Sequence, residues 1–252
     1  MDGVRAACHG HIMLLSDRIL FMDGESMIID KPSGLPVDPP RDGALSLENH
    51  VEGLKFGFKR WPTAVHRLDR DTSGCLLLAR NPKAHSRFQQ TFEAKLVSKR
   101  YIAVVTGVPE ESSGTIDLPL IKFSTEQSGW RMIVDHAKGK PPVTHWEKLG
   151  EVDGRALIQF IPETGRTHQI RAHAIYGLRM AIVGDPVYGK AGEPMLLHSA
   201  FLSVPREGKP PAEATAPTPE RFAAAGFTEE LFPMLAAPAL PPLAPPPELP
   251  GA

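Results

Sequence analysis

Residues 66–80 read HRLDRDTSGCLLLAR and join a polar loop to an apolar strand. The run 74–80 is a continuous apolar stretch of strand length, which predicts a strand buried in a core. Seven of the eight residues before it, 66–73, are polar or charged, and Gly74 permits a sharp turn between the two parts. Active-site residues concentrate in loops that a rigid sheet holds in place. The stretch therefore predicts a functional loop that leads into a buried strand.

The carboxylate of this loop, Asp69, lies between Arg67 and Arg70. Nearby positive charge favours the ionised form of a carboxyl group, so Asp69 is expected to be a carboxylate. Such a group can attack a sugar carbon or an activated ring as a nucleophile. The alternative interpretation is a surface loop held by ion pairs.

A second polar cluster, PETGRTHQIRAH, covers residues 162–173 and follows a predicted strand at 155–161. It is expected to open a helix with Thr167 as the N-cap. A helix N-terminus with Arg166 and Arg171 offers N–H groups and guanidinium forks to a phosphate, although Arg166 could instead pair with a carboxylate of the first loop. His168 and His173 are five residues apart and do not share a helix face, so structural histidines are expected rather than a metal site.

Further apolar runs predict a mixed, mainly antiparallel sheet with helices packed on it, an α+β fold. Asn81 and Pro82 predict the start of a helix. Strands are expected at 18–23, 27–31, 101–106, 143–149, 155–161 and 195–204.

The C-terminal part of the chain differs in composition, because 13 of the 26 prolines lie from Pro205 onward. Proline fits neither a helix interior nor a central strand. We therefore predict a catalytic domain at 1–205 and an extended, largely irregular proline-rich tail at 206–252. Within this tail, Leu231, Phe232 and Leu235 recur at helical spacing and could pack back onto the domain.

The overall composition is that of an ordinary globular protein, with a net charge of −1. The basic residues are concentrated at 51–110, where 11 basic and 5 acidic side chains give +6; this segment could attract phosphates or be a solvated helix face. The two cysteines, Cys8 and Cys75, do not indicate a disulfide scaffold, and no membrane span or secretory signal is expected, so a cytoplasmic protein is predicted. No nucleotide, nicotinamide or metal-binding motif is found, and no cofactor is expected.

Six segments match one family in order: KPSGLPV at 31–37, HRLDRDTSG at 66–74, KRYIAVVTG at 99–107, GRTHQIRAH at 165–173, GDPVYG at 184–189 and LHS at 197–199. Over residues 18–205 the sequence resembles the RluA-type pseudouridine synthases, in a short form without an S4 domain. The one departure is serine in LHS, where the family has alanine. The resemblance implies a curved, mixed sheet flanked by helices, an RNA-binding cleft across it, and cofactor-free conversion of uridines in ribosomal or transfer RNA to pseudouridine.

The resemblance also implies roles for individual residues. Asp69 would be the catalytic aspartate, Tyr101 would pack against the target uracil and help to remove its C5 proton, and Arg166 would form an ion pair with Asp69. Arg67 would fill the space that the flipped nucleotide leaves. The residues assigned to substrate binding are His66, Arg67, Arg70, Thr72, His168, Gln169 and Arg171.

RNA is the expected partner, with no membrane, no obligatory protein partner and a monomeric state. One alternative is an RNA-binding or folding factor that uses the same fold without catalysis. Another is a hydrolase built on His66, Asp69 and Ser73, or a metal-dependent one built on His66, His168 and His173.

Overall fold

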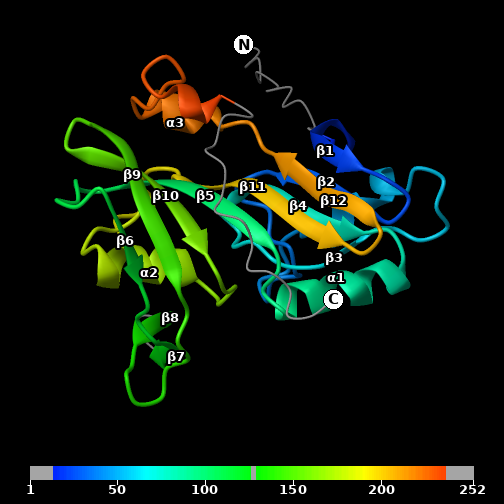
Figure 1. The fold of residues 1–252 in the computed structure, drawn as a ribbon, viewed down its shortest axis with the longest axis horizontal. Coiled ribbons are helices and arrows are strands. Elements are labelled where there is room, and N and C mark those ends of the chain that lie inside the picture. Colours follow the sequence, from blue (N-terminus) through cyan, green and yellow to red (C-terminus); the bar gives the residue numbers. More distant parts are fainter. Residues whose placement is uncertain (1–13, 126–128, 237–252) are drawn as a thin grey trace, which may run out of the picture.

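The computed structural model describes residues 14–125 and 129–236 (Figure 1). Within them, ten strands form one sheet with the central order β1-β2-β4-β11-β5-β10-β9-β6, while β12 pairs with β11 and β3 with β4. Among the described strands of this sheet, only the β4–β11 pair is parallel, so the predicted mixed, mainly antiparallel α+β fold is confirmed. The strands are β1 (Ile19–Met22), β2 (Ser26–Lys31), β3 (Thr63–Ala64), β4 (Ser73–Ala79), β5 (Ser98–Val105), β6 (Ser113–Ile116), β9 (Thr144–Val152), β10 (Arg155–Pro162), β11 (Leu197–Arg206) and β12 (Lys209–Thr215).

The other elements lie on or beside the sheet. The strands β7 (Leu120–Thr125) and β8 (Gly129–Val134) form a separate hairpin that projects from it (Figure 1). The α-helices are α1 (Pro82–Glu93), α2 (Gln169–Gly177) and α3 (Glu220–Ala224), and the short 3-10 helices are η1 (Leu15–Arg18), η2 (Leu47–Leu54) and η3 (Pro233–Leu235). Among the described residues, no helix combines the length and apolar character that crossing a membrane requires.

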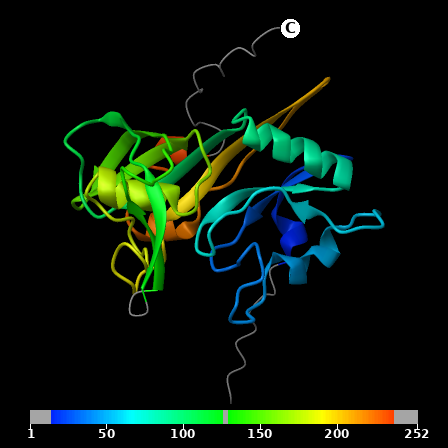
Figure 2. The ribbon, with the colours of Figure 1, turned by 90° about the horizontal axis from the view of Figure 1, so that it is seen from below.

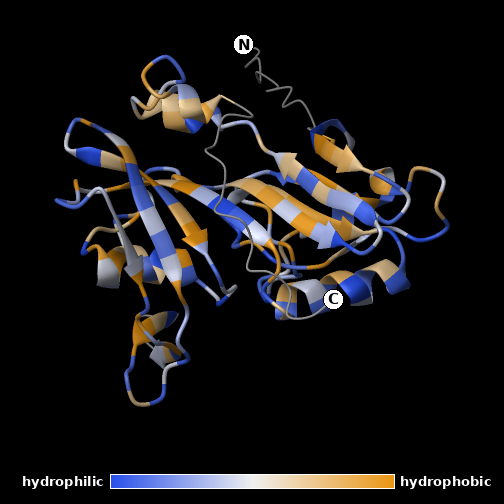
Figure 3. Ribbon diagram, viewed as in Figure 1, coloured by the Kyte–Doolittle hydropathy of each residue, from blue (hydrophilic) through white to orange (hydrophobic). Residues whose placement is uncertain are grey.

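The strand β4 is buried on both faces, which explains its continuous apolar sequence. Leu76 and Leu78 pack into one hydrophobic cluster, together with η1 and η2. Leu77 faces the other side, where α1 covers it with Phe88. Figure 2 shows α1 and the two 3-10 helices on opposite sides of these strands, and Figure 3 shows hydrophobic residues concentrated within the sheet. As expected, α1 begins after Asn81, whose side chain accepts a hydrogen bond from the N–H of Ala84.

The start of β4 lies against β11 at a very close backbone approach. Only two residue pairs, His198 with Ser73 and Ser199 with Gly74, connect the parallel strands. Gly74 has a φ of +106°, and a Cβ atom there would collide with the backbone of Ser199. Glycine is therefore required at this position, and the predicted sharp turn fixes the loop 66–73 at the centre of the sheet.

The predicted domain boundary at residue 205 is wrong, because β11 continues to Arg206 and forms a hairpin with β12. Among the described strands β12 pairs only with β11, so Pro210 and Pro211 lie on an edge strand, where proline is tolerated. Residues 237–252 lie outside the described part of the chain.

The helices after β12 also belong to the folded body. Phe222, Phe232 and Leu235 are buried in a cluster with Ile102 of β5, whereas Leu231 is exposed. The prediction that 228–235 packs back is thus confirmed for two of its three apolar residues. Arg221 of α3 additionally donates hydrogen bonds to the hydroxyl of Ser73 and to the carbonyl oxygen of Leu197.

Candidate active site

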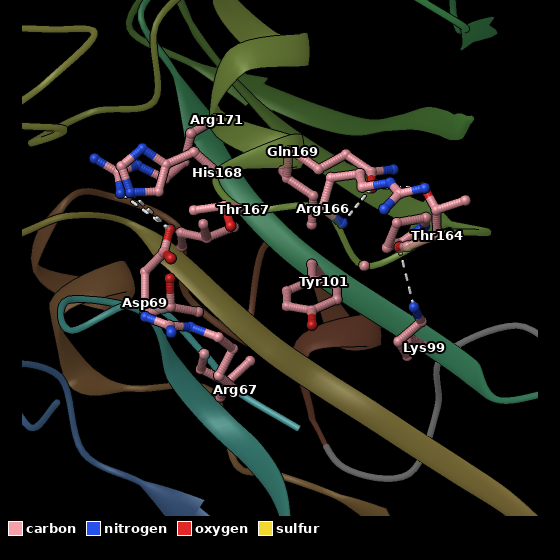
Figure 4. Close-up of a pocket in the computed structure, with 16 residues that line it drawn as sticks. Arg67, Asp69, Lys99, Tyr101, Thr164, Arg166, Thr167, His168, Gln169 and Arg171 are labelled. Atoms are coloured by element: carbon pink, nitrogen blue, oxygen red, sulfur yellow. Dashed lines mark hydrogen bonds and ion pairs between the residues drawn. The ribbon is translucent and has the colours of Figure 1, made fainter. Parts of the chain in front are cut away.

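The two polar clusters of the sequence face each other across β5 and form the walls of one pocket (Figure 4). The loop 66–73 supplies one wall, and the segment 162–171 supplies the other. Tyr101 of β5 lies between them, and the pocket has a volume of about 100 Å³. Residues separated by about a hundred positions in the chain therefore line one pocket.

The carboxylate of Asp69 points across the pocket toward α2 (Figure 4). Its Oδ2 atom accepts a hydrogen bond from Nη1 of Arg171 at 3.0 Å and lies 3.8 Å from Nε2 of His168. The side chain of Asp69 is 20% exposed, so the carboxylate remains accessible from the pocket. This geometry gives a hydrogen-bonded carboxylate with a fixed orientation and an open side.

The predicted ion pair between Arg166 and Asp69 is wrong, because Arg171 occupies that place. The helix α2 begins at Gln169 with His168, not Thr167, as its N-cap. Arg171 then lies in the first turn of α2 and is buried, whereas Arg166 lies in the preceding loop with an exposed side chain. Figure 4 shows Arg166 above Tyr101, on the side of the pocket away from Asp69.

A second carboxylate, Asp185, forms a buried ion pair with Arg171. Its two oxygens accept hydrogen bonds from Nε and Nη2 of Arg171 at 2.7 and 2.8 Å, and the backbone N–H groups of Val187 and Tyr188 donate to it as well. Burial alone would raise the pKa of Asp185, but Arg171 and these N–H groups hold it below its usual value. Burial would likewise lower the pKa of Arg171, yet the carboxylates of Asp185 and Asp69 raise it. The three groups form a charged chain, Asp185–Arg171–Asp69.

The contact of Asp185 with Arg171 was not predicted, although the segment 184–189 is one of the six matching motifs. The available signal was an aspartate followed by proline in a tight turn, a pattern that usually marks a structural turn. Its complete burial, with 0% of its surface exposed, depends on tertiary packing.

His168 connects the hairpin β7–β8 to Asp69. Its ring stacks on Trp130 of β8 with the ring centres 4.6 Å apart, and its Nδ1 lies 3.2 Å from the hydroxyl of Tyr188. That hydroxyl accepts a hydrogen bond from the N–H of Met132, so its proton can point to Nδ1. Burial lowers the pKa of His168. The contacts with Trp130 and Tyr188 thus hold the ring with Nε2 on the side of Asp69.

Tyr101 forms the floor of the pocket and is 9% exposed. Burial, as the main cause, raises the pKa of its hydroxyl to about 12, although a hydrogen bond with Ser199 acts in the opposite direction. At neutral pH the side chain is therefore a phenol, which can pack against a base and donate a hydrogen bond. Ser199 is the serine of LHS, and it faces Tyr101 across the β11–β5 pair.

Similarity to known proteins shows the family of the chain. Residues 25–176 match the family model described as RNA pseudouridylate synthase. The chain belongs to this family. It is 56% identical to an uncharacterized RNA pseudouridine synthase of Zymomonas mobilis, over 85% of this chain and 99% of that protein. It is 34% identical to ribosomal large subunit pseudouridine synthase D of the same organism, over 73% of this chain and 58% of that protein.

A solved structure supports the same assignment. Human RNA pseudouridylate synthase domain containing 4 superimposes with a TM-score of 0.70 at 26% identity, over 83% of this chain and 91% of that one. The RluA-type resemblance is confirmed, and the chain is an RNA pseudouridine synthase.

The other residues assigned to substrate binding lie at different depths in the synthase. Thr72 is buried and lines the pocket, and Arg67 lines it with an exposed side chain that pairs with Asp38 at 2.6 Å. Arg70 does not line the pocket; its exposed guanidinium lies 3.8 Å from Asp42. Arg67 therefore lies at the pocket, and Arg70 lies farther out.

Two assigned residues use their polar atoms within the protein. Gln169 accepts hydrogen bonds from Thr164 and Arg166 and donates to Val143 and Thr144, so its amide holds the loop before α2. The family resemblance implied substrate binding for Gln169, but its contacts are those of a residue that positions the segment 162–171.

His66 is used in a similar way. Its Nε2 accepts the N–H of Leu77 at 3.0 Å, and its ring stacks on Phe92 with the centres 4.8 Å apart. Burial lowers its pKa to about 3, so it is neutral at physiological pH. His173 is likewise bonded to Thr144 and Leu118, as expected of a structural histidine. Among the described residues, no group of His, Cys, Asp and Glu could hold a metal ion.

Buried lysines hold both walls of the synthase pocket. Nζ of Lys31 donates to the carbonyl oxygens of Pro32, Leu35 and Arg70, which fixes the loop 66–73. Nζ of Lys99 donates to the carbonyl oxygen of Thr164 in the opposite wall. Burial lowers the pKa of Lys31 to about 7 and that of Lys99 to about 8.

The Lys99→Met variant is expected to change the pH dependence of stability. The pKa of Lys99 is about 8 when folded against 10.5 in its ordinary state, so the folded chain binds fewer protons between these pH values. Lys99 therefore makes the free energy of unfolding rise with pH in that window. Between pH 7 and pH 9.5, the free energy of unfolding of the wild type should rise by up to about 2 kcal/mol relative to that of the variant. Urea denaturation at each pH measures this difference. A stability difference between wild type and Lys99→Met that stays constant with pH would contradict this prediction. The control is Lys83→Met, which replaces an exposed lysine and should show no such pH dependence.

Proposed function

We propose that this synthase converts selected uridines of ribosomal RNA, transfer RNA or both to pseudouridine, with Asp69 as the catalytic residue. The observation that carries the proposal is the accessible carboxylate of Asp69, held by Arg171 beside the phenol ring of Tyr101. Similarity to ribosomal large subunit pseudouridine synthase D favours ribosomal RNA as the first substrate to test.

The proposed reaction needs no co-reactant. The bond from N1 of uracil to C1′ of the ribose breaks, the base turns, and a bond from C5 to the same C1′ forms. C5 loses a proton and N1 gains one, so substrate and product have the same atoms. Asp69 either attacks the ribose at C1′ or removes a ribose proton that permits cleavage, and the apolar floor at Tyr101 keeps the free base in place. The target nucleotide must leave its stack first, which costs a few kcal/mol and favours loops.

A wider hollow continues from the pocket and is suited to the RNA backbone. It has a volume of about 470 Å³ and shares Arg67, Lys99, Tyr101 and Arg166 with the pocket. Lys95 adds another cation, while Glu93 and Glu163 are its carboxylates. We assign phosphate contacts to the exposed cations here, so binding should weaken as salt increases. A monomer that acts in the cytoplasm without an obligatory protein partner completes the proposal.

Mapping of pseudouridine across all RNAs tests this function. The gene is deleted in the source organism and restored either as wild type or as Asp69→Asn. A uridine whose modification disappears on deletion and returns only with the wild type would identify both the activity and its RNA. If Asp69→Asn restores the modification, the catalytic role of Asp69 is refuted. If no site changes, the fold serves RNA binding or folding instead of modification.

A further inference from the structure

A second concave surface lies at the far end of α1, outside the catalytic pocket. Its volume is about 480 Å³, and we call it the Trp61 pocket. In Figure 1 the loop that precedes β3 forms the right-hand margin of the molecule, next to the start of α1. The residues of this pocket that matter here are Lys59, Arg60, Trp61, Thr63, Asn81 and His85.

The chemistry of the Trp61 pocket combines an aromatic face with unneutralised positive charge. The ring of Trp61 is 55% exposed, and Nζ of Lys55 lies 4.7 Å from its centre. Lys59 and Arg60 are exposed, and no ion pair involves either of them in the described part of the chain. No carboxylate lines the pocket among the described residues. The N-terminal end of the twelve-residue helix α1 adds a positive dipole end.

Arg80 anchors the loop that carries these groups. Arg80 packs over the ring of Phe58 at 3.9 Å and donates hydrogen bonds to the carbonyl oxygens of Asp23, Lys55 and Phe56. Arg80 thus uses both of its terminal nitrogens within the protein, while Trp61 and its neighbouring cations remain exposed. A fixed aromatic ring beside free cations suits a ligand that has flat rings and negative charge.

The chain segment 63–66 leads from the Trp61 pocket to the hollow beside the active site and packs along α1. Thr63 lines the Trp61 pocket and His66 lines the hollow beside the active site, three residues further along the chain. Two residues of α1 contact this segment: His85 forms a hydrogen bond with the carbonyl oxygen of Ala64, and Phe92 stacks on His66.

We propose that the Trp61 pocket is a second RNA-binding site, in which a base flanking the target uridine stacks on Trp61 and adjacent phosphates pair with Lys59 and Arg60. This inference rests on the proposed function, because it takes the same RNA strand as its ligand. Base stacking on an aromatic side chain is tolerant of sequence, and the phosphate contacts add salt dependence. The site would lengthen the RNA segment that the synthase contacts without touching the reacting uridine.

The test compares the affinities of the full chain for two fluorescent oligouridylates, of about 5 and about 15 nucleotides. Trp61→Ala should raise the Kd for the longer probe about tenfold, and Trp61→Phe should stay within about twofold of wild type. The Lys59→Ala/Arg60→Ala variant should raise the same Kd and reduce the slope of log Kd against log salt by about 1.4, the value for two phosphates. The control Lys138→Ala/Lys190→Ala removes two exposed cations elsewhere and should change neither. The shorter probe makes fewer contacts, so each variant should raise its Kd less than the Kd of the longer probe.

Two results would overturn the inference. One is an unchanged Kd of Trp61→Ala for the longer probe, whether or not the wild type binds it tightly. The other is a combined result in which the Lys59→Ala/Arg60→Ala variant binds oligouridylate and polyglutamate equally more weakly, and Trp61→Ala changes neither affinity. That result would mean that the surface attracts any polyanion, including an acidic protein. Pseudouridine formation by the wild type is measured in parallel. Its absence refutes the proposed function, whereas the effect of Trp61→Ala on binding decides the present inference.

Discussion

Replacing Asp69 by asparagine is expected to reduce pseudouridine formation by about four orders of magnitude or more while the fold persists. Asparagine keeps the shape of the side chain, and its carbonyl oxygen can still accept the hydrogen bond from Arg171. Arg171 also keeps both bonds to Asp185, so no buried charge loses its partner. What is lost is the negative charge that must attack the ribose or remove its proton.

The measurement is the single-turnover rate of pseudouridine formation in an RNA that the wild type modifies. Asp71→Asn is the matched control, because it removes a carboxylate from the same loop but not from the pocket lining. It should retain most of the wild-type rate. A wild-type rate in Asp69→Asn would exclude Asp69 as the catalytic group, and RNA affinity measured alongside should be nearly unchanged.

Replacing Arg171 by methionine is expected to affect both activity and stability. The buried carboxylate of Asp185 loses its bidentate partner, which costs about 3–5 kcal/mol of unfolding free energy. Asp69 loses the hydrogen bond that orients it, so the rate of the chemical step should fall by at least about a hundredfold. Urea denaturation and single-turnover kinetics measure the two effects.

Two further variants separate orientation of Asp69 from simple unfolding. Adding Asp185→Asn to Arg171→Met removes the unpaired buried charge and should restore part of the stability without restoring the rate. Arg166→Met should change stability by less than about 0.5 kcal/mol, because its side chain is exposed. If Arg166→Met abolished the chemical step and Arg171→Met did not, the ion pair originally expected from the sequence would be the functional one.

The parts of the site that could be predicted are those set by local sequence. The loop 66–73, the turn at Gly74 and the buried strand β4 follow from composition and apolar run length. Local sequence does not predict which arginine, Arg166 or Arg171, contacts Asp69, because both lie in one motif. That choice depends on His168, whose φ of 52° turns the chain just before α2 and directs only Arg171 toward Asp69. Spacing along the chain contains no information about that backbone angle.

The C-terminal segment shows a different limit of sequence interpretation. Its prolines indicated an irregular tail, yet Pro210 and Pro211 fit β12 because only one side of that strand is paired within the described sheet. The burial of Phe222 against Ile102 likewise depends on partners more than a hundred residues away. Composition alone cannot distinguish an edge strand from a tail.

The position of β11 has a consequence for how the enzyme comes into being. This strand lies between β4 and β5, although it follows both of them by about a hundred residues. A chain emerging from the ribosome therefore presents two strands with open edges until its last quarter has been made. Long-range pairing of this kind slows folding and leaves edges that can join other chains. We expect truncated or stalled chains to aggregate and to lack an assembled site, so that only completed synthesis yields a working catalyst.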